Sequence, residues 1–566
     1  MAVSIKIAAY CNSDDALVAW APDDFIPECR GFQLERARKT KTAEKIDLVE
    51  NRLGFAKDKP KSGDHRPSDV WPFQRFNWTD HAVDVGNQVR YRVTAMVRDA
   101  AGKLVHGVAS AWTPWLTLTP DCGDGFSCYF NRGLVISQFV ARYMRDKKLS
   151  SGKLKASLKK SDDPKFRAFL QGDLGARLME LLAEPKTTED ALHAALYELD
   201  DSLLESAMIA LKGKLNLILA NGSDKAGDGN ADARKTLIDG GVVPIARLLK
   251  SKGLGHNKFV VRSDKNGPNA VWTGSTNWST TGLCTQINNG LLIEDSDLAK
   301  LYKAQWDLLN DSSPPSLDPA GFSDKLMVSN DKAHPLTIGS AKVTVWFTRT
   351  SDGRDMDALR KLIADAKQSI LFLMFTPGPT GLHTEAGARA NEKDMYVKGV
   401  VSTLGQTKAD NDKNVLDIQL VSSDHAFKPD HYTVVQPQGE DGSIGPWIGE
   451  VTRTNFLSQV GHAIVHSKIL VIDGLSSDPV VVTGSHNFSG SASTKNDENL
   501  VIVRGHQQLA RAYSAHIMSV YQHYRYRSYI REMLAAGKKP WSYLDDDDQW
   551  LKIELKSKAA EIDFWT

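Results

Sequence analysis

The sequence has few cysteines and lacks a long apolar run. Its 566 residues include five cysteines, an odd number without CxxC spacing, which argues against both a disulfide framework and a cysteine-based zinc site. No stretch approaches the roughly 18 apolar residues of a membrane-spanning helix. The N-terminus has a single early lysine and a short apolar patch, so it makes a poor signal peptide. We therefore expect a protein of the cytoplasm, or one exported by a leaderless route.

An excess of charge of either sign is also missing. The formal net charge is +1, so the chain lacks the strongly basic balance that binding to a phosphate backbone usually leaves. Hydrophobic residues make up 41% and charged residues 25%, which are ordinary values for a soluble protein. The length indicates several domains, and the default class is an enzyme or a binding protein.

Residues 1–120 have the texture of an all-β domain. Short β-branched or aromatic runs separated by turn residues predict a small sandwich with strands at 5–10, 16–21, 31–38, 89–99 and 110–118. Gly86, Tyr91, Val93 and Ala95, with Trp20 in an earlier strand, resemble a fibronectin type III or immunoglobulin-like module. Another kind of small β domain is the alternative. The polar, lysine-rich segment 39–67 is predicted to be a long inserted loop.

The rest of the chain alternates strand and helix patterns. A strand, a helix and a strand are predicted at 192–199, 200–213 and 215–221, and a helix followed by two buried strands at 355–368, 369–375 and 415–421. This order is typical of a parallel sheet covered by helices. Two copies of one α/β unit explain it most economically, and we expect one in residues 121–335 and the other in residues 336–566.

A short motif recurs between the two units at a constant offset of 210 residues. The paired positions are His256 and His466, Lys258 and Lys468, Gly274 and Gly484, Ser275 and Ser485, and Asn277 and Asn487. Five specified residue types match at a given start about once in three million tries, so the recurrence is not chance. The motif therefore belongs to a true internal repeat.

The spacing within the motif places its side chains together. Residues i and i+2 of a strand project from one face, so each histidine points the same way as its lysine. The serine and asparagine of GSxN do the same one strand later, while the glycine lets the backbone come close to a ligand or a neighbouring strand. Each copy thus supplies an imidazole, an ammonium group, an amide and a hydroxyl, which is half of a phosphate site.

Two such halves, face to face, provide what cleavage of a phosphodiester requires. One imidazole is the nucleophile, the other donates a proton to the leaving oxygen, and the lysines and asparagines surround the phosphoryl oxygens. Because no carboxylate cluster is needed, we expect neither a metal nor another cofactor.

The sequence HxK with a downstream aspartate, followed by GSxN, resembles the HKD motif of the phospholipase D superfamily, and two copies in one chain resemble its bilobal members. The resemblance covers residues 121–566 and implies two similar lobes, each a mixed sheet flanked by helices, with the active site between them. It also implies a covalent phosphohistidine that water or an alcohol resolves. Since one chain holds both half-sites, we expect a monomer.

The aspartate of the motif is irregular between the copies. Asp473 lies five residues after Lys468, whereas Asp264 lies six residues after Lys258. We therefore expect both aspartates to have mainly supporting, structural roles.

A second difference concerns the residue 32 positions after each histidine, which is Glu498 in the second copy and Asn288 in the first. The family often places there a carboxylate that holds the imidazole. A carboxylate stabilises the protonated ring, whereas an amide orients it without raising its basicity much. We expect Glu498 to hold His466, which makes His466 the general acid and His256 the nucleophile.

A glycerophospholipid is the expected substrate, with its headgroup released or exchanged with an alcohol, because the charge is near neutral and the β domain could orient the protein on a membrane surface. A metal-independent nuclease of the same superfamily is the main alternative, and a non-catalytic scaffold is an alternative of another class. Loops at 375–383 and 422–435 are expected to select the substrate. The aromatic, arginine-rich segment 521–532 is expected to be a surface helix that packs its tyrosines on the second lobe, and contact with a lipid headgroup or a nucleic-acid backbone is the alternative.

Overall fold

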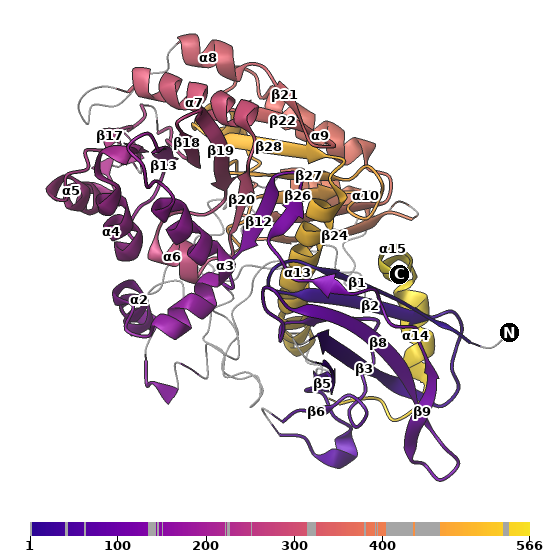
Figure 1. Ribbon diagram of the computed structural model, residues 1–566. Coiled ribbons are helices and arrows are strands. Elements are labelled where there is room, and N and C mark those ends of the chain that lie inside the picture. The colour runs from indigo at the N-terminus through magenta and orange to yellow at the C-terminus, as the bar shows by residue number, and fades with distance from the viewer. Residues whose placement is uncertain are drawn as a thin grey trace.

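The computed structural model describes residues 3–566 except 40–42, 62–63, 134–142, 144–145, 150, 221, 224–226, 251, 314–323, 378–380, 391, 393, 403–433, 436–464 and 536–542. An all-β domain is followed by two α/β lobes, and the last two helices return to the β domain (Figure 1). We call the α/β part up to residue 330 lobe 1 and the part from residue 334 to residue 535 lobe 2.

The β domain consists of two antiparallel sheets, with the strand orders β1-β2-β7 and β10-β8-β3-β4, and β9 also pairs with β8. Trp20 and Tyr91, which the sequence singles out, are both fully buried between them. The predicted all-β region is therefore confirmed. Its strands are β1 (Ile5–Cys11), β2 (Ala16–Pro22), β3 (Cys29–Lys39), β4 (Glu44–Leu48), β7 (Asn77–Asp80), β8 (Gln88–Arg98), β9 (Leu104–Ala109) and β10 (Leu116–Thr117).

The prediction that segment 39–67 is a loop is wrong for part of its length. Strand β4 lies inside it and pairs with β3 from Glu35↔Leu48 to Lys39↔Glu44. Because β4 is at the edge of its sheet, its polar and charged residues stay largely exposed, so a strand forms there without an apolar run. The segment also contains β5 (Glu50–Asn51), a 3-10 turn (Ala56–Asp58) and β6 (Arg66–Pro67).

The sheets of the two lobes have the same strand order. That of lobe 1 runs β11-β12-β20-β19-β18-β13-β14-β17, and that of lobe 2 runs β21-β22-β28-β27-β26-β23-β24-β25. In lobe 1, β13, β14 and β17 are parallel, as are β23, β24 and β25 in lobe 2, and the other pairs are antiparallel. Two similar lobes, each with a mixed sheet, are therefore confirmed.

The strands of lobe 1 are β11 (Asp121–Gly123), β12 (Phe126–Phe130), β13 (Ala191–Leu196), β14 (Leu215–Leu219), β17 (Ile245–Ala246), β18 (Lys258–Asp264), β19 (Gly267–Gly274) and β20 (Asn289–Ile293), with a small hairpin of β15 (Gly222–Ser223) and β16 (Gly227–Asp228). Those of lobe 2 are β21 (His334–Ile338), β22 (Ala341–Phe347), β23 (Ser369–Met374), β24 (Tyr396–Val401), β25 (Val434–Val435), β26 (Ile469–Ile472), β27 (Val480–Gly484) and β28 (Asn499–Arg504).

Helices flank both sheets (Figure 1). Lobe 1 contains α2 (Ser151–Lys160), α3 (Pro164–Ala183), α4 (Ser202–Leu211), α5 (Ala231–Asp239), α6 (Thr280–Cys284), α7 (Ser296–Asp311) and α8 (Asp324–Asn330). Lobe 2 contains α9 (Arg354–Asp365), α10 (Leu382–Arg389), α12 (Gly490–Thr494) and α13 (Gln507–Ala535), and the chain closes with α14 (Gln549–Ser557) and α15 (Ala559–Trp565).

Most of the predicted elements are found. The segments predicted at 192–221 become β13, α4 and β14, and those at 355–375 become α9 and β23. The strand predicted at 415–421 lies outside the described residues, and the strand that pairs with β23 in parallel is β24. Within the part of the chain that the structure describes, no helix has the length and apolar character needed to cross a membrane.

A single hydrophobic core joins the two lobes. It includes Phe259 and Tyr302 of lobe 1 and Phe347 and Tyr513 of lobe 2. Helix α13 runs through the middle of the molecule, where it contacts β24 of lobe 2, β12 of lobe 1 and β1 of the β domain (Figure 1). Tyr521 of this helix is buried in the core, as predicted for its tyrosines, whereas the predicted surface position of the helix is wrong at this residue.

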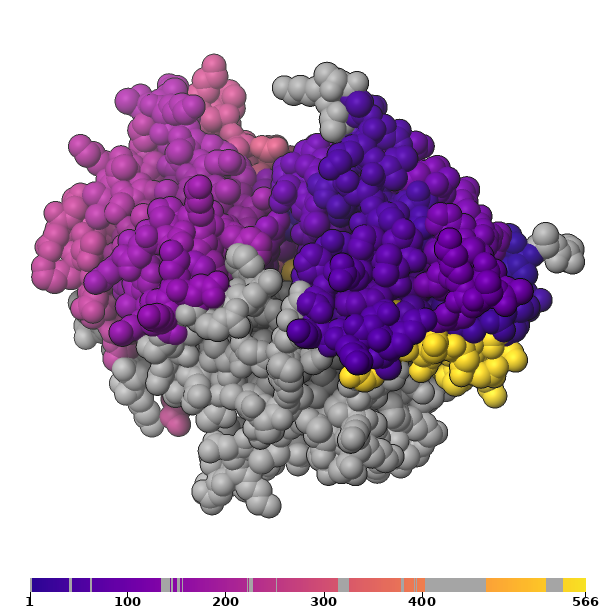
Figure 2. Space-filling model, turned by 90° about the horizontal axis from the view of Figure 1, so that it is seen from below, coloured from indigo at the N-terminus to yellow at the C-terminus, as the bar shows by residue number. Residues whose placement is uncertain are grey.

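The C-terminal helices hold the β domain in place. The Trp550 indole donates to the carbonyl of Cys29 at 3.0 Å, and the Trp565 indole donates to Tyr396 of lobe 2 at 3.2 Å. Tyr10 of β1 donates to the carbonyl of Trp565 at 3.1 Å. In Figure 2 the yellow C-terminal residues accordingly lie against the indigo β domain.

Candidate active site

The two motif copies lie at corresponding strand ends. Lys258 is the first residue of β18, and Lys468 directly precedes β26. The Lys258 ammonium donates to the carbonyl of His256 at 2.9 Å, and the Lys468 ammonium donates to that of His466 at 2.5 Å. Each histidine and its lysine therefore form one unit, and the unit is the same in both lobes.

Each histidine is held from the opposite lobe. Nδ1 of His256 lies 3.0 Å from Oε2 of Glu498, and Nδ1 of His466 lies 2.9 Å from Oδ1 of Asn288. The prediction that Glu498 holds His466 is therefore wrong. The constant offset pointed to a partner in the same copy, but the lobes face one another across the site. Asn288, directly ahead of β20, therefore contacts His466 of lobe 2. Glu498, directly ahead of β28, contacts His256 of lobe 1.

Backbone hydrogen bonds fix this exchange of partners. The amide of His466 donates to the carbonyl of Ile287, and the amide of Asp497 donates to the carbonyl of Leu254, both at 2.9 Å. Ile287 and Asp497 directly precede Asn288 and Glu498, so the chain segments that carry the partners are bonded to the segments that carry the histidines.

The two lysines are almost completely buried, with Lys258 1% and Lys468 0% exposed. Burial lowers the pKa of Lys258 to about 7, against the opposing effect of Glu498 and Glu198. Burial also lowers the pKa of Lys468 well below its usual value, and the charge of Lys258 adds to the effect. Two ammonium groups buried in one site are costly to keep charged, and binding of an anion would reduce this cost.

The two imidazoles are also buried. Burial lowers the pKa of His256 to about 4, although Glu498 opposes the change, and it lowers the pKa of His466 well below its usual value together with Lys468. Burial alone would raise the pKa of Glu498, but His256 outweighs it and the pKa is lowered. At neutral pH the site therefore combines neutral imidazoles with an ionised carboxylate on His256.

The motif serines bind the backbone of the next strand. Ser275 Oγ accepts from the amide of Asn289 at 3.0 Å and donates to Oδ1 of Asn288 at 2.8 Å. Ser485 Oγ accepts from the amide of Asn499 at 3.0 Å. The structure shows this supporting role, and the predicted contact of both serines with substrate stays a prediction.

The motif glycines allow two strands to approach closely. A Cβ atom at Gly274 would lie 2.3 Å from the carbonyl oxygen of Asn289, and one at Gly484 would lie 2.3 Å from that of Asn499. Both glycines also have positive φ values, +145° and +143°. Only glycine meets both conditions, so these positions set the distance between β19 and β20 and between β27 and β28.

The motif asparagines differ between the lobes. Nδ2 of Asn277 donates to Oε2 of Glu198 at 2.6 Å, whereas Asn487 is partly exposed. The side-chain oxygens of both asparagines are buried and find no hydrogen-bond donor among the described residues. Each amide therefore has a free acceptor oxygen, and Nδ2 of Asn277 has a second hydrogen beyond the one that it donates to Glu198.

The two motif aspartates lie away from the histidines. The carboxylate of Asp473 accepts from the amides of Lys367, Gln368 and Ser369 at 2.7 to 3.1 Å, which joins the end of β26 to the start of β23.

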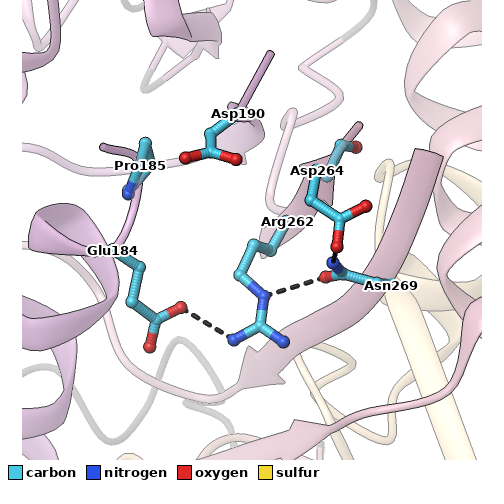
Figure 3. A pocket seen from close by; sticks show the side chains of 7 residues that line it. Glu184, Pro185, Asp190, Arg262, Asp264 and Asn269 are labelled. Carbon is cyan, nitrogen blue, oxygen red and sulfur yellow. Dashed lines mark hydrogen bonds and ion pairs between the residues drawn. The ribbon is translucent and has the colours of Figure 1, made fainter. Parts of the chain in front are cut away.

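Asp264 is at the far end of β18, where it accepts from Nδ2 of Asn269 at 2.9 Å on the wall of a surface pocket of about 260 Å³ (Figure 3). In this pocket Arg262 bonds Asn269, Glu184 and Glu294, so its guanidinium is occupied by protein groups. Lys258 stands at the other end of the strand.

Three further residues belong to the site and were not predicted individually. Tyr197 and Phe375 follow β13 and β23, and their rings lie 4.7 Å from those of His256 and His466. Glu198 follows Tyr197. Phe375 lies inside the loop predicted to select substrate. The common position after two equivalent strands could have identified the aromatic pair, whereas no offset marks Glu198.

The arrangement can bind a tetrahedral anion and transfer its phosphoryl group. Ammonium and amide donors come from both lobes, and the two neutral imidazoles supply a nucleophile and a proton carrier. Among the residues that the structure describes, no group of three or more His, Cys, Asp or Glu side chains is arranged to hold a metal ion.

Residues 359–521 match the family model described as "Cardiolipin synthase, PLD-like domain", so lobe 2 carries a PLD-like domain. No curated protein matches the chain. Among solved structures, phosphatidylserine synthase of Haemophilus influenzae Rd KW20 is 13% identical, with a TM-score of 0.41, over 70% of this chain and 93% of that one.

Two other solved structures are more distant. Yeast tyrosyl-DNA phosphodiesterase is 12% identical, with a TM-score of 0.32, over 59% of this chain and 88% of its own. Nuc from Salmonella typhimurium is 16% identical, with a TM-score of 0.21, over 25% of this chain and 88% of its own. Similarities at this level do not choose among activities.

Proposed function

We propose that this chain is a phospholipase D-type phosphodiesterase that hydrolyses glycerophospholipids, or transfers their phosphatidyl group to an alcohol, through a phosphohistidine. The observation that carries the proposal is the crosswise pairing of His256 with Glu498 and of His466 with Asn288. It makes one site out of the PLD-like domain in lobe 2 and the equivalent half-site of lobe 1.

His256 is the nucleophile in this proposal. Glu498 holds Nδ1, which leaves Nε2 to attack phosphorus and increases its basicity. Asn288 orients His466 without stabilising its protonated form, so His466, neutral in the free site, takes up a proton when the anionic diester binds and is then a strong acid. The roles of the two histidines are those expected from the sequence, but the reason differs. The sequence predicted that the carboxylate of Glu498 holds the general acid, whereas here it holds the nucleophile.

The reaction then proceeds in two steps. Nε2 of His256 forms a bond to phosphorus while the bond from phosphorus to the leaving oxygen breaks, and His466 gives that oxygen its proton. Water or an alcohol next gives a proton to His466 and attacks phosphorus, and the phosphorus–nitrogen bond breaks. Lys258, Lys468 and the motif asparagines stabilise the phosphoryl oxygens in both steps.

A lipid substrate is favoured by two observations. The family model that matches lobe 2 carries the name of a phospholipid synthase. The net charge of +1 gives the protein no overall basic field for nucleic acid. We further propose that the β domain is fibronectin type III-like, since Tyr91 donates to Asp80 at 2.9 Å at the end of β7 and packs near buried Trp20.

The test compares lipid and nucleic acid in the presence of EDTA. Vesicles of phosphatidylcholine, phosphatidylethanolamine or phosphatidylglycerol are incubated with the full-length protein and a primary alcohol, and single- and double-stranded DNA are incubated in parallel. We expect free headgroup or a phosphatidyl-alcohol, and loss of at least about 1,000-fold in His256→Ala and His466→Ala.

The matched control is His106→Ala, which removes an exposed histidine of β9 and should keep wild-type activity. Cleavage of DNA without any lipid product would show that the nuclease alternative is correct. Absence of both products would support the non-catalytic alternative.

A further inference from the structure

Glu198 places a carboxylate inside the phosphate site. It lies two residues after β13, and its Oε2 accepts from Nδ2 of Asn277 at 2.6 Å. The backbone holds it there, because the amide of Trp278 donates to the carbonyl of Glu198 at 3.0 Å and Leu199 forms a β-bridge to Trp278. The carboxylate is therefore fixed against one of the amides that should bind a phosphoryl oxygen.

The charge of Glu198 acts on the lysines of both lobes. Burial raises its pKa, and Lys258 and Lys468 both oppose the change. In turn Glu198 opposes the lowering of the pKa of each lysine. Glu198 therefore acts electrostatically on both halves of the site. With Glu498, it brings the formal charge of the lysine pair to zero when both carboxylates are ionised.

Lobe 2 does not repeat this charge. The residue that follows the aromatic side chain after β23 is Thr376, where lobe 1 has Glu198 after Tyr197. The histidines, the lysines and the asparagines recur in both copies. Glu198 does not recur, although it contacts Asn277 of the motif. A carboxylate beside an anion site opposes the binding of every anion. It opposes some anions more than others, and this difference can give selectivity.

We propose that Glu198 makes the site selective for singly charged phosphodiesters over doubly charged phosphate monoesters. This inference rests on the proposed function. A diester carries one negative charge, whereas a monoester carries between about 1.5 and 2 at pH 7. The fixed carboxylate repels the second charge more strongly than the first, because little water screens the interaction in a buried site. The same repulsion expels the monoester that hydrolysis produces.

The experiment measures binding, so it does not depend on turnover. Dissociation constants of inorganic phosphate and of dimethyl phosphate are determined by calorimetry at pH 8 for the full-length wild type, Glu198→Gln and Glu198→Asp. Glutamine keeps an oxygen that accepts from Asn277 and removes only the charge. We expect Glu198→Gln to bind phosphate about tenfold more tightly and dimethyl phosphate at most about twofold more tightly.

Two variants separate charge from structure. Glu198→Asp keeps the charge and should keep the wild-type ratio of the two constants. Glu184→Gln removes a carboxylate from the pocket in Figure 3 and should also leave the ratio unchanged. Thermal unfolding checks that each variant is folded, and Glu198→Ala replaces Glu198→Gln if the latter is not.

An unchanged ratio in Glu198→Gln, or weaker phosphate binding, would overturn the proposal. Failure of phosphate to bind any variant would overturn it as well. Cleavage of lipid by the wild type with an unchanged ratio would refute the selectivity alone. Absence of cleavage with a tenfold change in the ratio would refute the proposed function and leave selectivity for anions established.

Discussion

The histidines of the two lobes differ in the group that holds each ring. His256 faces the carboxylate of Glu498, and His466 faces the amide of Asn288. Glu498 is itself fixed, because its Oε1 accepts from Nδ2 of Asn496 at 2.9 Å. In the proposed mechanism, the carboxylate on one ring and the amide on the other divide the two imidazoles into a nucleophile and an acid.

Glu498→Gln should lower kcat by about 10- to 100-fold, because glutamine does not stabilise the Nδ1–H form of His256 as a carboxylate does. The rate of formation of the phospho-adduct should fall by the same factor. Nitrogen NMR of labelled protein should show His256 shifting from one tautomer to a mixture. The matched control is Glu294→Gln, which changes the residue directly after β20, at the end of the strand away from Asn288, and should keep wild-type rates. An unchanged kcat, or an adduct on His466, contradicts the assignment.

The motif residues could be singled out from the sequence because they repeat, and the repeat is a property of one chain read in order. The partner of each histidine could not be read in the same way. Glu498 lies 32 positions from His466 but contacts His256, 242 positions away, since the contact depends on how the lobes face each other. Glu198 has no equivalent in lobe 2, so no comparison within the sequence could reveal it.

At the scale of elements, lobe 2 has a buried contact between a histidine and an aspartate at a motif position where lobe 1 has a threonine. His486 of GSHN lies 3.0 Å from Asp355 of α9, where the corresponding residue of lobe 1 is Thr276. Thr350 also donates to Asp355 at 2.9 Å, and Ser493 of α12 is a third partner. The pair therefore ties α9 and α12 to the loop that carries Asn487.

The buried carboxyl of Asp355 should make the free energy of unfolding depend on pH in the acid range. Burial would raise the pKa of Asp355, but the hydrogen bond and charge of His486, with Ser493 and Thr350, outweigh it and lower the pKa to about 2. A carboxyl whose pKa is lowered in the folded state stabilises above its usual value of 3.8 and loses this contribution as pH falls through 2. The shift corresponds to about 2 kcal/mol.

Urea unfolding of the wild type and Asp355→Asn tests this expectation. The wild type should be more stable by at least about 2 kcal/mol at pH 5, and the difference should shrink as pH is lowered toward 2.5. Asp357→Asn changes an exposed residue of the same helix and should differ from the wild type by less than about 0.5 kcal/mol at either pH. A difference that stays constant with pH would show that Asp355 does not act through its charge.

The elements themselves were predictable where the pattern is strong. Buried strands β13, β14 and β23 and the amphipathic helix α9 follow directly from apolar periodicity. Strand β4 was missed because an edge strand needs no apolar face, and β24 was missed although it is largely buried. The order of the strands within each sheet could not be predicted from the sequence, because the neighbours of a strand are decided by contacts between distant segments.

At the scale of the whole molecule, the lobes are joined by polar bonds as well as by a shared core. Oδ1 of Asn499 accepts from Thr273 at 2.6 Å, and Nδ2 of Asn289 donates to Thr483 at 2.8 Å, two contacts related by the repeat. Arg247 of lobe 1 lies 2.6 Å from Asp497, and both are almost fully buried. Asp497 directly precedes Glu498, so the contact between the lobes also positions the partner of the nucleophile.

Because both halves of the site lie in one chain, the protein should act as a monomer. A mixture of inactive His256→Ala and His466→Ala should stay inactive, since each chain carries one damaged half-site and its lobes are bonded to each other. The measurement is the initial rate on a phosphodiester at several protein concentrations, with wild type diluted into His256→Ala as the control for detection. Recovery toward about a quarter of the wild-type rate, as expected for random exchange of lobes between chains, would show that the site assembles between two molecules.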